Sequence, residues 1–206
     1  TVGAFGADED GCADCRGTRP AWNRVVRLGV YEGVLGEIVR DVKFNRFRTL
    51  GARIGFMLGD HLRSRLVETG LDPAAIAIVP LPMSRRRFLE RGIDHALTIS
   101  RGLRTATGGT IVRILSRYHG PTQLAVPASD RRSNVSKVFR VRNSVRPPRS
   151  VSCWVIVDDV RTTGASLQSA ARVLRKYLES KAQETGADLA WRAPIWGGIV
   201  ASADEP

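Results

Sequence analysis

The sequence predicts an α/β protein with a mainly parallel sheet flanked by helices. Three segments share one pattern, in which a short apolar run rich in β-formers is followed by loop residues and usually by helical spacing; the runs are 75–79, 111–115 and 151–157. Strands that alternate with helices in this way are typical of parallel sheets. The length of 206 residues suits one such domain with a small appendage.

The region before these segments predicts one strand and two helices. Residues 25–31 alternate as a strand does, and the helix that comes next ends at the basic residue Lys43. The apolar positions of this first helix are Val34, Leu35, Ile38, Val39 and Val42. The second helix should end near Gly70, and its apolar face comprises Leu50, Ile54, Met57 or Leu58, Leu62 and Leu66.

The three apolar runs lead into different structures. A helix is expected over about residues 93–105 after the first run, and another after the third run, with Leu167, Ala170, Ala171, Leu174 and Leu178 on its apolar face. The second run leads into residues 118–148, a polar and basic stretch whose length predicts a functional or mobile loop. Towards the end of the chain, residues 189–191 predict a weak strand.

Composition limits the domain count and the compartment. Residues 1–24 predict an irregular leader, and residues 25–200 the α/β domain. The longest uncharged apolar run, 74–83, is too short for a membrane span, and acidic residues stand where a signal peptide needs basic ones. Three cysteines do not make a disulfide framework, and Cys153 is expected in the core. A cytoplasmic protein without membrane insertion is therefore expected.

The charge balance favours a polyanionic partner. Lys and Arg number 32 against 20 Asp and Glu, a net charge of +12. Such an excess suits nucleic acid or a phosphorylated small molecule, and charge alone does not separate the two.

The third run ends in the most informative motif of the chain. Its strand finishes in Asp158-Asp159 and turns through Thr162-Thr163-Gly164 into a helix. Ligands of parallel sheets lie beyond the carboxyl ends of the strands, and a helix N-terminus with hydroxyls suits a monophosphate. Acids beside an anion site are costly unless they meet ribose hydroxyls or Mg²⁺. The motif therefore predicts a sugar-phosphate site.

With these residues the segment resembles the phosphoribosyl pyrophosphate (PRPP) binding motif of type I phosphoribosyltransferases. Other landmarks make the chain, over about residues 12–180, similar to the ComF family of competence and DNA-utilisation proteins: Pro80-Leu81-Pro82, Arg91-Gly92-Ile93-Asp94-His95-Ala96, Gln123, Arg131-Arg132-Ser133-Asn134-Val135 and Phe139. Members of that family typically carry Arg-Gly-Phe-Asn-Gln where this chain has Arg91 to His95.

The resemblance implies a type I phosphoribosyltransferase fold that binds PRPP with Mg²⁺ and transfers phosphoribose to an acceptor. Asp158 and Asp159 would face the ribose hydroxyls as catalytic residues. The PRPP-binding residues would also include Val160, Arg161, Thr162, Thr163, Gly164, Ala165 and Ser166. The candidates for the pyrophosphate and for a loop that closes over the reacting centre are Pro80, Arg85, Arg91, Arg131, Arg132 and Lys137.

Three alternatives remain open at this level. The arginine cluster at 85–87 is also compatible with a solvated face. The chain as a whole is also compatible with a protein that binds PRPP but does not catalyse the transfer. A DNA-binding role beside a helicase-like competence partner is the third alternative, on a basic strip that comprises Arg140, Arg142, Arg146 and Arg149.

The remaining residue signals are weak. Cys12 and Cys15 have the spacing of half a zinc site, whereas a structural site needs four ligands, so zinc is not expected in this chain as it stands. ComF-like proteins generally begin with a zinc ribbon of two such pairs, and this chain begins at Thr1 as though an upstream pair were absent. His61 and His119 are expected at the surface, and Trp154, Trp191 and Trp196 in the core.

Overall fold

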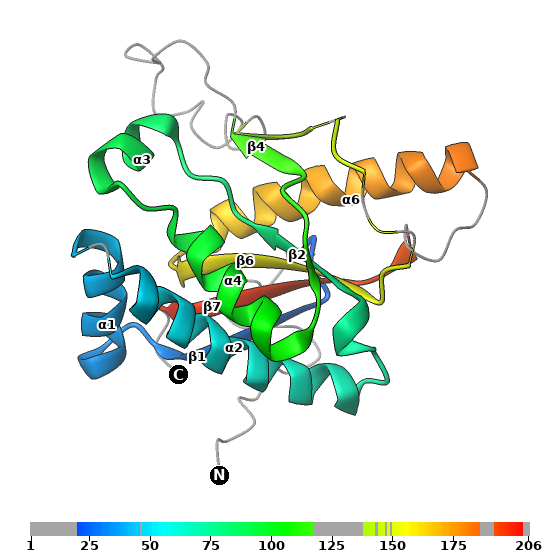
Figure 1. Cartoon of the computed structure of the whole chain (residues 1–206). Coiled ribbons are helices and arrows are strands. Elements are labelled where there is room, and N and C mark those ends of the chain that lie inside the picture. Colours follow the sequence, from blue (N-terminus) through cyan, green and yellow to red (C-terminus); the bar gives the residue numbers. More distant parts are fainter. Residues whose placement is uncertain are drawn as a thin grey trace.

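A parallel sheet forms the centre of the molecule (Figure 1), a computed structural model that describes residues 20–45, 47–117, 138–142, 144–146, 148, 150–185 and 192–203. Five strands lie in the order β1-β7-β6-β2-β3, and all four pairings are parallel. Their bounds are β1 Arg24–Val30, β2 Ile76–Pro80, β3 Thr110–Ile111, β6 Cys153–Arg161 and β7 Ile195–Ser202. The predicted α/β class with a mainly parallel sheet flanked by helices is confirmed.

Helices cover both faces of this sheet (Figure 1). The helices α1 (Gly33–Phe44), α2 (Arg48–Glu68) and α4 (His95–Thr107) pack on one face, and α6 (Ala165–Thr185) packs on the other. The sheet therefore separates two apolar cores, one on the side of α1, α2 and α4 and one on the side of α6. Strand β6 contributes to both, because Val155 and Val157 face α2 and α4 while Trp154 and Ile156 face α6. This alternation determines where the residues after Val157 point.

The run at 111–115 is not one strand, as predicted, but parts of two. Its first residue belongs to β3, and its last begins β4 (Leu115–Arg117), which pairs antiparallel with β5 (Phe139–Val141). Phe139 is buried in the α6-side core, so its burial anchors the hairpin. The stretch expected as a loop therefore contains a strand, while residues 118–137 lie outside the described part of the chain.

Strand β7 was not predicted, although all eight of its residues are buried. Two consecutive glycines, Gly197 and Gly198, lower its strand propensity. Gly197 lies close to α6, because a Cβ there would be 2.9 Å from Cδ2 of Leu167, whose side chain would have to shift. The weak strand expected at 189–191 lies outside the described residues.

Two further differences concern helices. The basic stretch at 85–87 begins a short helix, α3 (Arg85–Arg91), because Ser84 caps it by accepting a hydrogen bond from the backbone N–H of Arg87. The sequence left open whether Met57 or Leu58 lies on the apolar face of α2. Leu58 is buried, and Met57 is 61% exposed. A 3₁₀ turn, η1 (Pro73–Ala75), leads into β2.

Residues just before β1 also contact the core. Ala21 and Trp22 pack against the α6-side core, and the backbone N–H of Ala21 donates to Oε1 of Gln168. Cys153, Trp154 and Trp196 are buried as predicted, and His61 is half-buried on α2. Cys12, Cys15, His119 and Trp191 are outside the described residues. None of the described helices combines the length and apolarity that a membrane crossing needs.

Candidate functional site

A cavity of about 410 Å³ opens at the carboxyl ends of strands β6 and β2. Its charged lining residues are Lys43, Arg87, Arg91, Arg117, Asp158 and Asp159, and its other lining residues are Tyr31, Leu81, Pro82, Met83, His95, Ala96, Val160, Thr162 and Ser166. Four cationic side chains thus meet two acidic ones. Such a lining suits a ligand that carries several negative charges and also hydroxyl groups.

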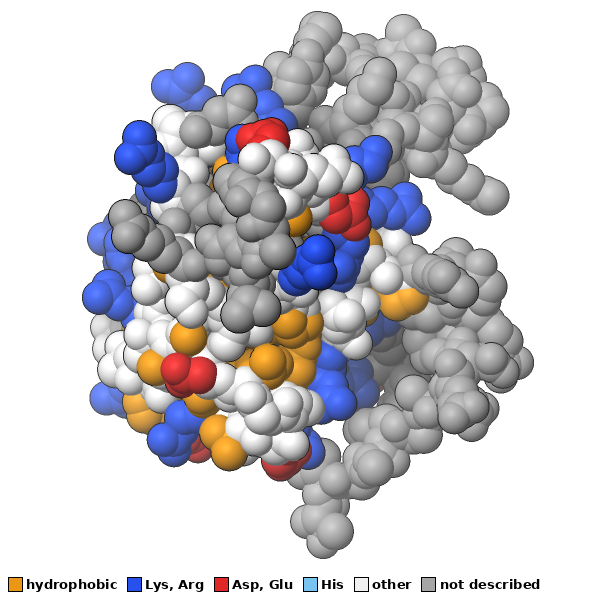
Figure 2. Space-filling model, turned by 90° about the vertical axis from the view of Figure 1, so that its right-hand side faces the viewer, with side chains coloured by type: hydrophobic (Ala, Val, Ile, Leu, Met, Phe, Trp, Pro, Cys, Tyr) orange, Lys and Arg blue, Asp and Glu red, His pale blue; other side chains and the backbone are white. Residues whose placement is uncertain are grey.

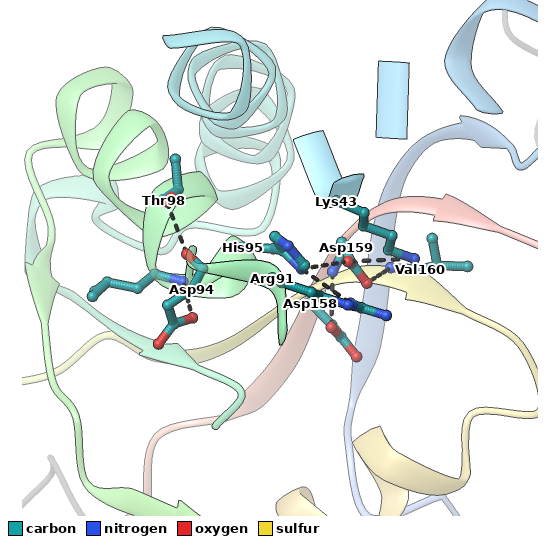
Figure 3. Close-up of polar contacts among 9 residues, drawn as sticks. Lys43, Arg91, Asp94, His95, Thr98, Asp158, Asp159 and Val160 are labelled. Atoms are coloured by element: carbon teal, nitrogen blue, oxygen red, sulfur yellow. Dashed lines mark hydrogen bonds and ion pairs between the residues drawn. The ribbon is translucent and has the colours of Figure 1, made fainter. Parts of the chain in front are cut away.

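The two acids point to different sides of the sheet because they continue the alternation of strand β6. Asp159 lies on the side of α1 and α4, whose residues Lys43 and His95 reach it. Asp158 belongs to the other set of positions and also lines the smaller hollow at the start of α6. The two carboxylates therefore have different partners (Figure 3).

Asp159 is held on both of its carboxylate oxygens. Its Oδ2 lies 3.4 Å from Nζ of Lys43 and 3.4 Å from Nδ1 of His95, and its Oδ1 accepts a 2.7 Å hydrogen bond from the backbone N–H of Val160. Burial opposes the ionisation of this carboxyl, but the hydrogen bond of His95 and the charge of Lys43 together hold its pKa below the usual value. Asp159 is therefore a fixed carboxylate.

Asp158 is held less tightly. Its Oδ1 accepts a 2.9 Å hydrogen bond from the backbone N–H of Asp159, and no described residue donates to its Oδ2. Burial, followed by the charge of Asp159, raises the pKa of Asp158 to about 8. This carboxyl therefore takes up a proton more readily than an ordinary aspartate, so its Oδ2 can exchange hydrogen bonds with a hydroxyl group as donor or acceptor.

The turn after β6 forms a hollow of about 70 Å³ at the start of α6. Thr162, Thr163 and Ser166 line it and are exposed, and Gly164 has a φ of 70°, which a residue with a Cβ adopts only with strain. The first backbone N–H groups of a helix lack partners within the helix. Together with three hydroxyls they offer a cradle for a single phosphate group.

The cationic side of the cavity is built from α3 and β4. Arg87 and Arg91 come from α3, and Arg117 comes from the end of β4. Burial lowers the pKa of Arg117, and the nearby charge of Arg87 lowers it further. Two guanidinium groups close enough to repel one another, beside a cavity, favour an anion between them.

Among the pyrophosphate candidates from the sequence that the structure describes, only some line the cavity. Arg91 lines the cavity, whereas Arg85 does not. Arg87, which is exposed as Arg85 is, lines it instead. Pro80 is buried as the last residue of β2 and pairs with Val157, and the three residues after it line the cavity. Arg131, Arg132 and Lys137 lie outside the described residues.

Sequence reasoning missed several residues of this cavity that come from other elements. Tyr31 follows β1, and Lys43, His95 and Arg117 lie on α1, α4 and β4, far from the β6 motif in sequence. Tyr31 and Lys43 lie side by side, with Nζ 5.6 Å from the ring centroid. His95 alone among them had a signal in the sequence, its place among the family landmarks. The others had none, because no local pattern marks residues that become neighbours only when the chain folds.

Comparisons with known proteins bear on this site. Competence protein F of Haemophilus influenzae is 31% identical over 173 residues, which cover 80% of this chain and 72% of that protein. This chain belongs to the ComF family. The DNA utilization protein YhgH of Salmonella typhi is 29% identical over 79% of this chain and 70% of its own length, and the protein of that name from Escherichia coli K12 is 27% identical.

The other comparisons are more distant. No protein-family model matches the chain. The solved structure of adenine phosphoribosyltransferase from Leishmania tarentolae is 17% identical, covers 72% of this chain and 74% of its own, and has a TM-score of 0.31.

The departures of this ComF-family chain from Arg-Gly-Phe-Asn-Gln now have structural roles. Ile93 is buried, Asp94 caps α4 by accepting a 3.0 Å hydrogen bond from the backbone N–H of Leu97, and His95 turns into the cavity against Asp159 (Figure 3). Asp94 thus replaces an amide with a carboxylate where a helix N-terminus favours negative charge.

Proposed function

We propose that this chain binds PRPP with Mg²⁺ and transfers the phosphoribosyl group to an acceptor. The observation that carries the proposal is that a cavity lined by two half-buried acids and three arginines adjoins the hollow at the start of α6 and shares Asp158, Thr162 and Ser166 with it. PRPP presents a 5′-phosphate, ribose hydroxyls and a pyrophosphate in that order. Each of the three groups in the cavity matches one of them.

The chain's own residues account for the binding of each part. Thr162, Thr163 and Ser166 would hold the 5′-phosphate, and the free oxygen of Asp158 would meet a ribose hydroxyl. The three cavity arginines would hold the pyrophosphate; they are Arg87, Arg91 and Arg117. Asp159 would fix the geometry of this region because both of its oxygens already have partners.

Transfer requires no nucleophile from the protein. The bond between the ribose C1 and the pyrophosphate oxygen breaks, the pyrophosphate leaves with the electron pair, and the acceptor forms a bond to C1 and loses a proton. The arginines would stabilise the charge that develops on the leaving group. Tyr31 and Lys43 line the wall beside the acids.

Magnesium fits this site as a companion of the substrate. Among the residues that the structure describes, no three His, Cys, Asp or Glu side chains gather as a metal site. Mg²⁺ commonly binds one or two carboxylates and takes its other ligands from substrate phosphates and water. Asp158 is the acid with an oxygen available for it, and the ion would neutralise charge on the pyrophosphate.

Ligand binding is measured first, because it requires no knowledge of the acceptor. We expect PRPP with Mg²⁺ to raise the melting temperature of the protein, since a ligand at 100 times its Kd stabilises the folded state by about 2.7 kcal/mol. ATP with Mg²⁺ is the matched control, because it is a polyanion with a ribose but no 5′-monophosphate. A melting curve that PRPP leaves unchanged, or that ATP shifts equally, contradicts the binding proposal. Turnover is then measured as pyrophosphate release with bases, amines and nucleotides.

A second candidate function is DNA binding, because the relatives are named for competence and for DNA utilization. Arg140, Arg142 and Arg146 are exposed on and after β5, next to the hairpin strand that carries Arg117. Arg149 lies outside the described residues. On the face in Figure 2, however, Lys and Arg side chains are spread over the surface with acidic side chains between them.

A salt titration tests the DNA role. Replacing Arg140, Arg142 and Arg146 by Glu should abolish binding to single- or double-stranded DNA, and the wild-type affinity should fall steeply as salt rises. The control replaces three exposed arginines of other elements by Glu: Arg63, Arg86 and Arg172. Equal losses in both variants would mean that net charge, and not the strip at β5, attracts the DNA.

A further inference from the structure

His95 occupies a position between the acidic and the cationic sides of the cavity (Figure 3). It is the first residue of α4 and only 2% exposed. Its Nδ1 lies 3.4 Å from Oδ2 of Asp159 and 3.3 Å from Nη1 of Arg91. Its other ring nitrogen, Nε2, is buried and has no hydrogen-bond partner in the described part of the chain.

The two neighbours make opposite demands on Nδ1. A carboxylate only accepts hydrogen bonds, so Asp159 requires a proton on Nδ1, whereas a guanidinium only donates, so Arg91 requires a lone pair there. A neutral imidazole meets one demand at a time, by placing its proton on Nδ1 or on Nε2. Because Nε2 has no partner in either arrangement among the described residues, the choice depends on which neighbour engages Nδ1.

We infer that His95 is a positioning residue that couples the two sides of the site. When Arg91 turns to an anion in the cavity, Nδ1 is released and its N–H donates to Asp159, which completes the hydrogen bonds of the acidic side. When the anion is absent, Arg91 competes with Asp159 for Nδ1.

This inference rests on the proposed function, because it assigns the anion to pyrophosphate and the acidic side to ribose. It predicts that pyrophosphate favours the binding of ribose 5-phosphate through His95. Any ligand that strengthens another must itself be strengthened by the same factor. Direct repulsion between the two anions, or a shared Mg²⁺, also contributes to that factor, so the role of His95 appears only as a difference between variants.

The experiment titrates ribose 5-phosphate by calorimetry in the absence and presence of saturating inorganic pyrophosphate, at one fixed Mg²⁺ concentration. The ratio of the two Kd values is the coupling factor. We expect this factor to be about tenfold larger in the wild type than in His95→Gln, within the usual range for coupled sites. A glutamine side chain can donate from its nitrogen to Asp159 and accept at its oxygen from Arg91, so the two neighbours no longer compete for one atom.

A second variant removes the competing donor instead of the histidine. In Arg91→Met, Nδ1 is always available to Asp159, so ribose 5-phosphate alone should bind about as tightly as it binds the wild type with pyrophosphate. Arg86→Met is the matched control, because this α3 arginine is exposed, pairs with Glu90 and does not line the cavity. Its coupling factor should equal that of the wild type.

The outcomes separate this inference from the proposed function. If the wild type binds both ligands and all variants share its coupling factor, His95 is only a structural residue and the inference is overturned while the proposed function stands. If the wild type binds neither ligand, the proposed function fails and takes the inference with it. Should His95→Gln not fold, the comparison of Arg91→Met with Arg86→Met decides alone.

Discussion

Replacing both acids of strand β6, as Asp158→Asn/Asp159→Asn, should remove the stabilisation of the protein by PRPP. Asp158 then loses its hydrogen bond to the ribose, and the side chain at 159 no longer holds Lys43 and His95 in place. One lost hydrogen bond to a charged group costs about 1.5–3 kcal/mol, which corresponds to a Kd about 10- to 150-fold weaker. The measurement is the shift in melting temperature with PRPP and Mg²⁺, relative to the same variant without ligand. This reference matters because the unpaired Lys43 lowers the stability of the variant itself.

The matched control removes two carboxylates from the surface. Asp60→Asn/Glu68→Gln changes the net charge equally, and both side chains are exposed on α2, where they pair with Arg63 and Arg65. Such surface pairs contribute little stability. The control should keep the full PRPP shift, and a shift that survives in the β6 variant would place the ligand elsewhere.

The second large effect concerns the contact between α2 and α4. In Gly102→Ala, the new Cβ would overlap the backbone oxygen of Ala52 and lie 2.6 Å from the backbone nitrogen of Phe56. Backbone atoms cannot turn aside as a flexible side chain does, so the two helices must separate. We expect a loss of about 3 kcal/mol of unfolding free energy, measured by urea denaturation. This loss should exceed the gain of about 1 kcal/mol that alanine brings to a helix interior.

Gly36→Ala on α1 provides the comparison. The added Cβ would lie 3.5 Å from the backbone of Tyr31, an ordinary van der Waals distance, so the helix propensity of alanine should stabilise this variant slightly. If Gly102→Ala were as stable as Gly36→Ala, α2 and α4 would not approach one another as closely as the structure shows. Because α4 also carries His95 into the cavity, this contact bears on the site as well as on stability.

A sequence predicts best where the residues that act together are also neighbours in the chain. The strand from Cys153, the acids at 158 and 159, the turn at Gly164 and helix α6 succeed one another directly, and each has its own local signal. The alternation of a strand even determines that the two acids face opposite sides. For this reason the parallel sheet and the helix that follows β6 could be predicted.

Prediction was weaker where packing outweighs local preference. The glycines of β7 disfavour a strand, but pairing with β1 and β6 and complete burial form one there. Residues 111–115 have the apolar pattern of a single strand, yet burial of Phe139 divides them between the sheet and a hairpin. In both places the energy of long-range contacts exceeds the propensity of a few residues.

The chain alone therefore determined that β6 ends in two acids and a turn with three hydroxyls at the start of a helix. Only the tertiary structure decided that Lys43 and His95 hold Asp159, that Arg117 lies near Arg87, and that Asp158 keeps an oxygen free of described donors. The physical reason is that hydrogen bonds and charges act over a few ångströms in space. Residues from α1, α4 and β4 come within that range of β6 only when the helices pack on the sheet, and no local pattern records which of them will do so.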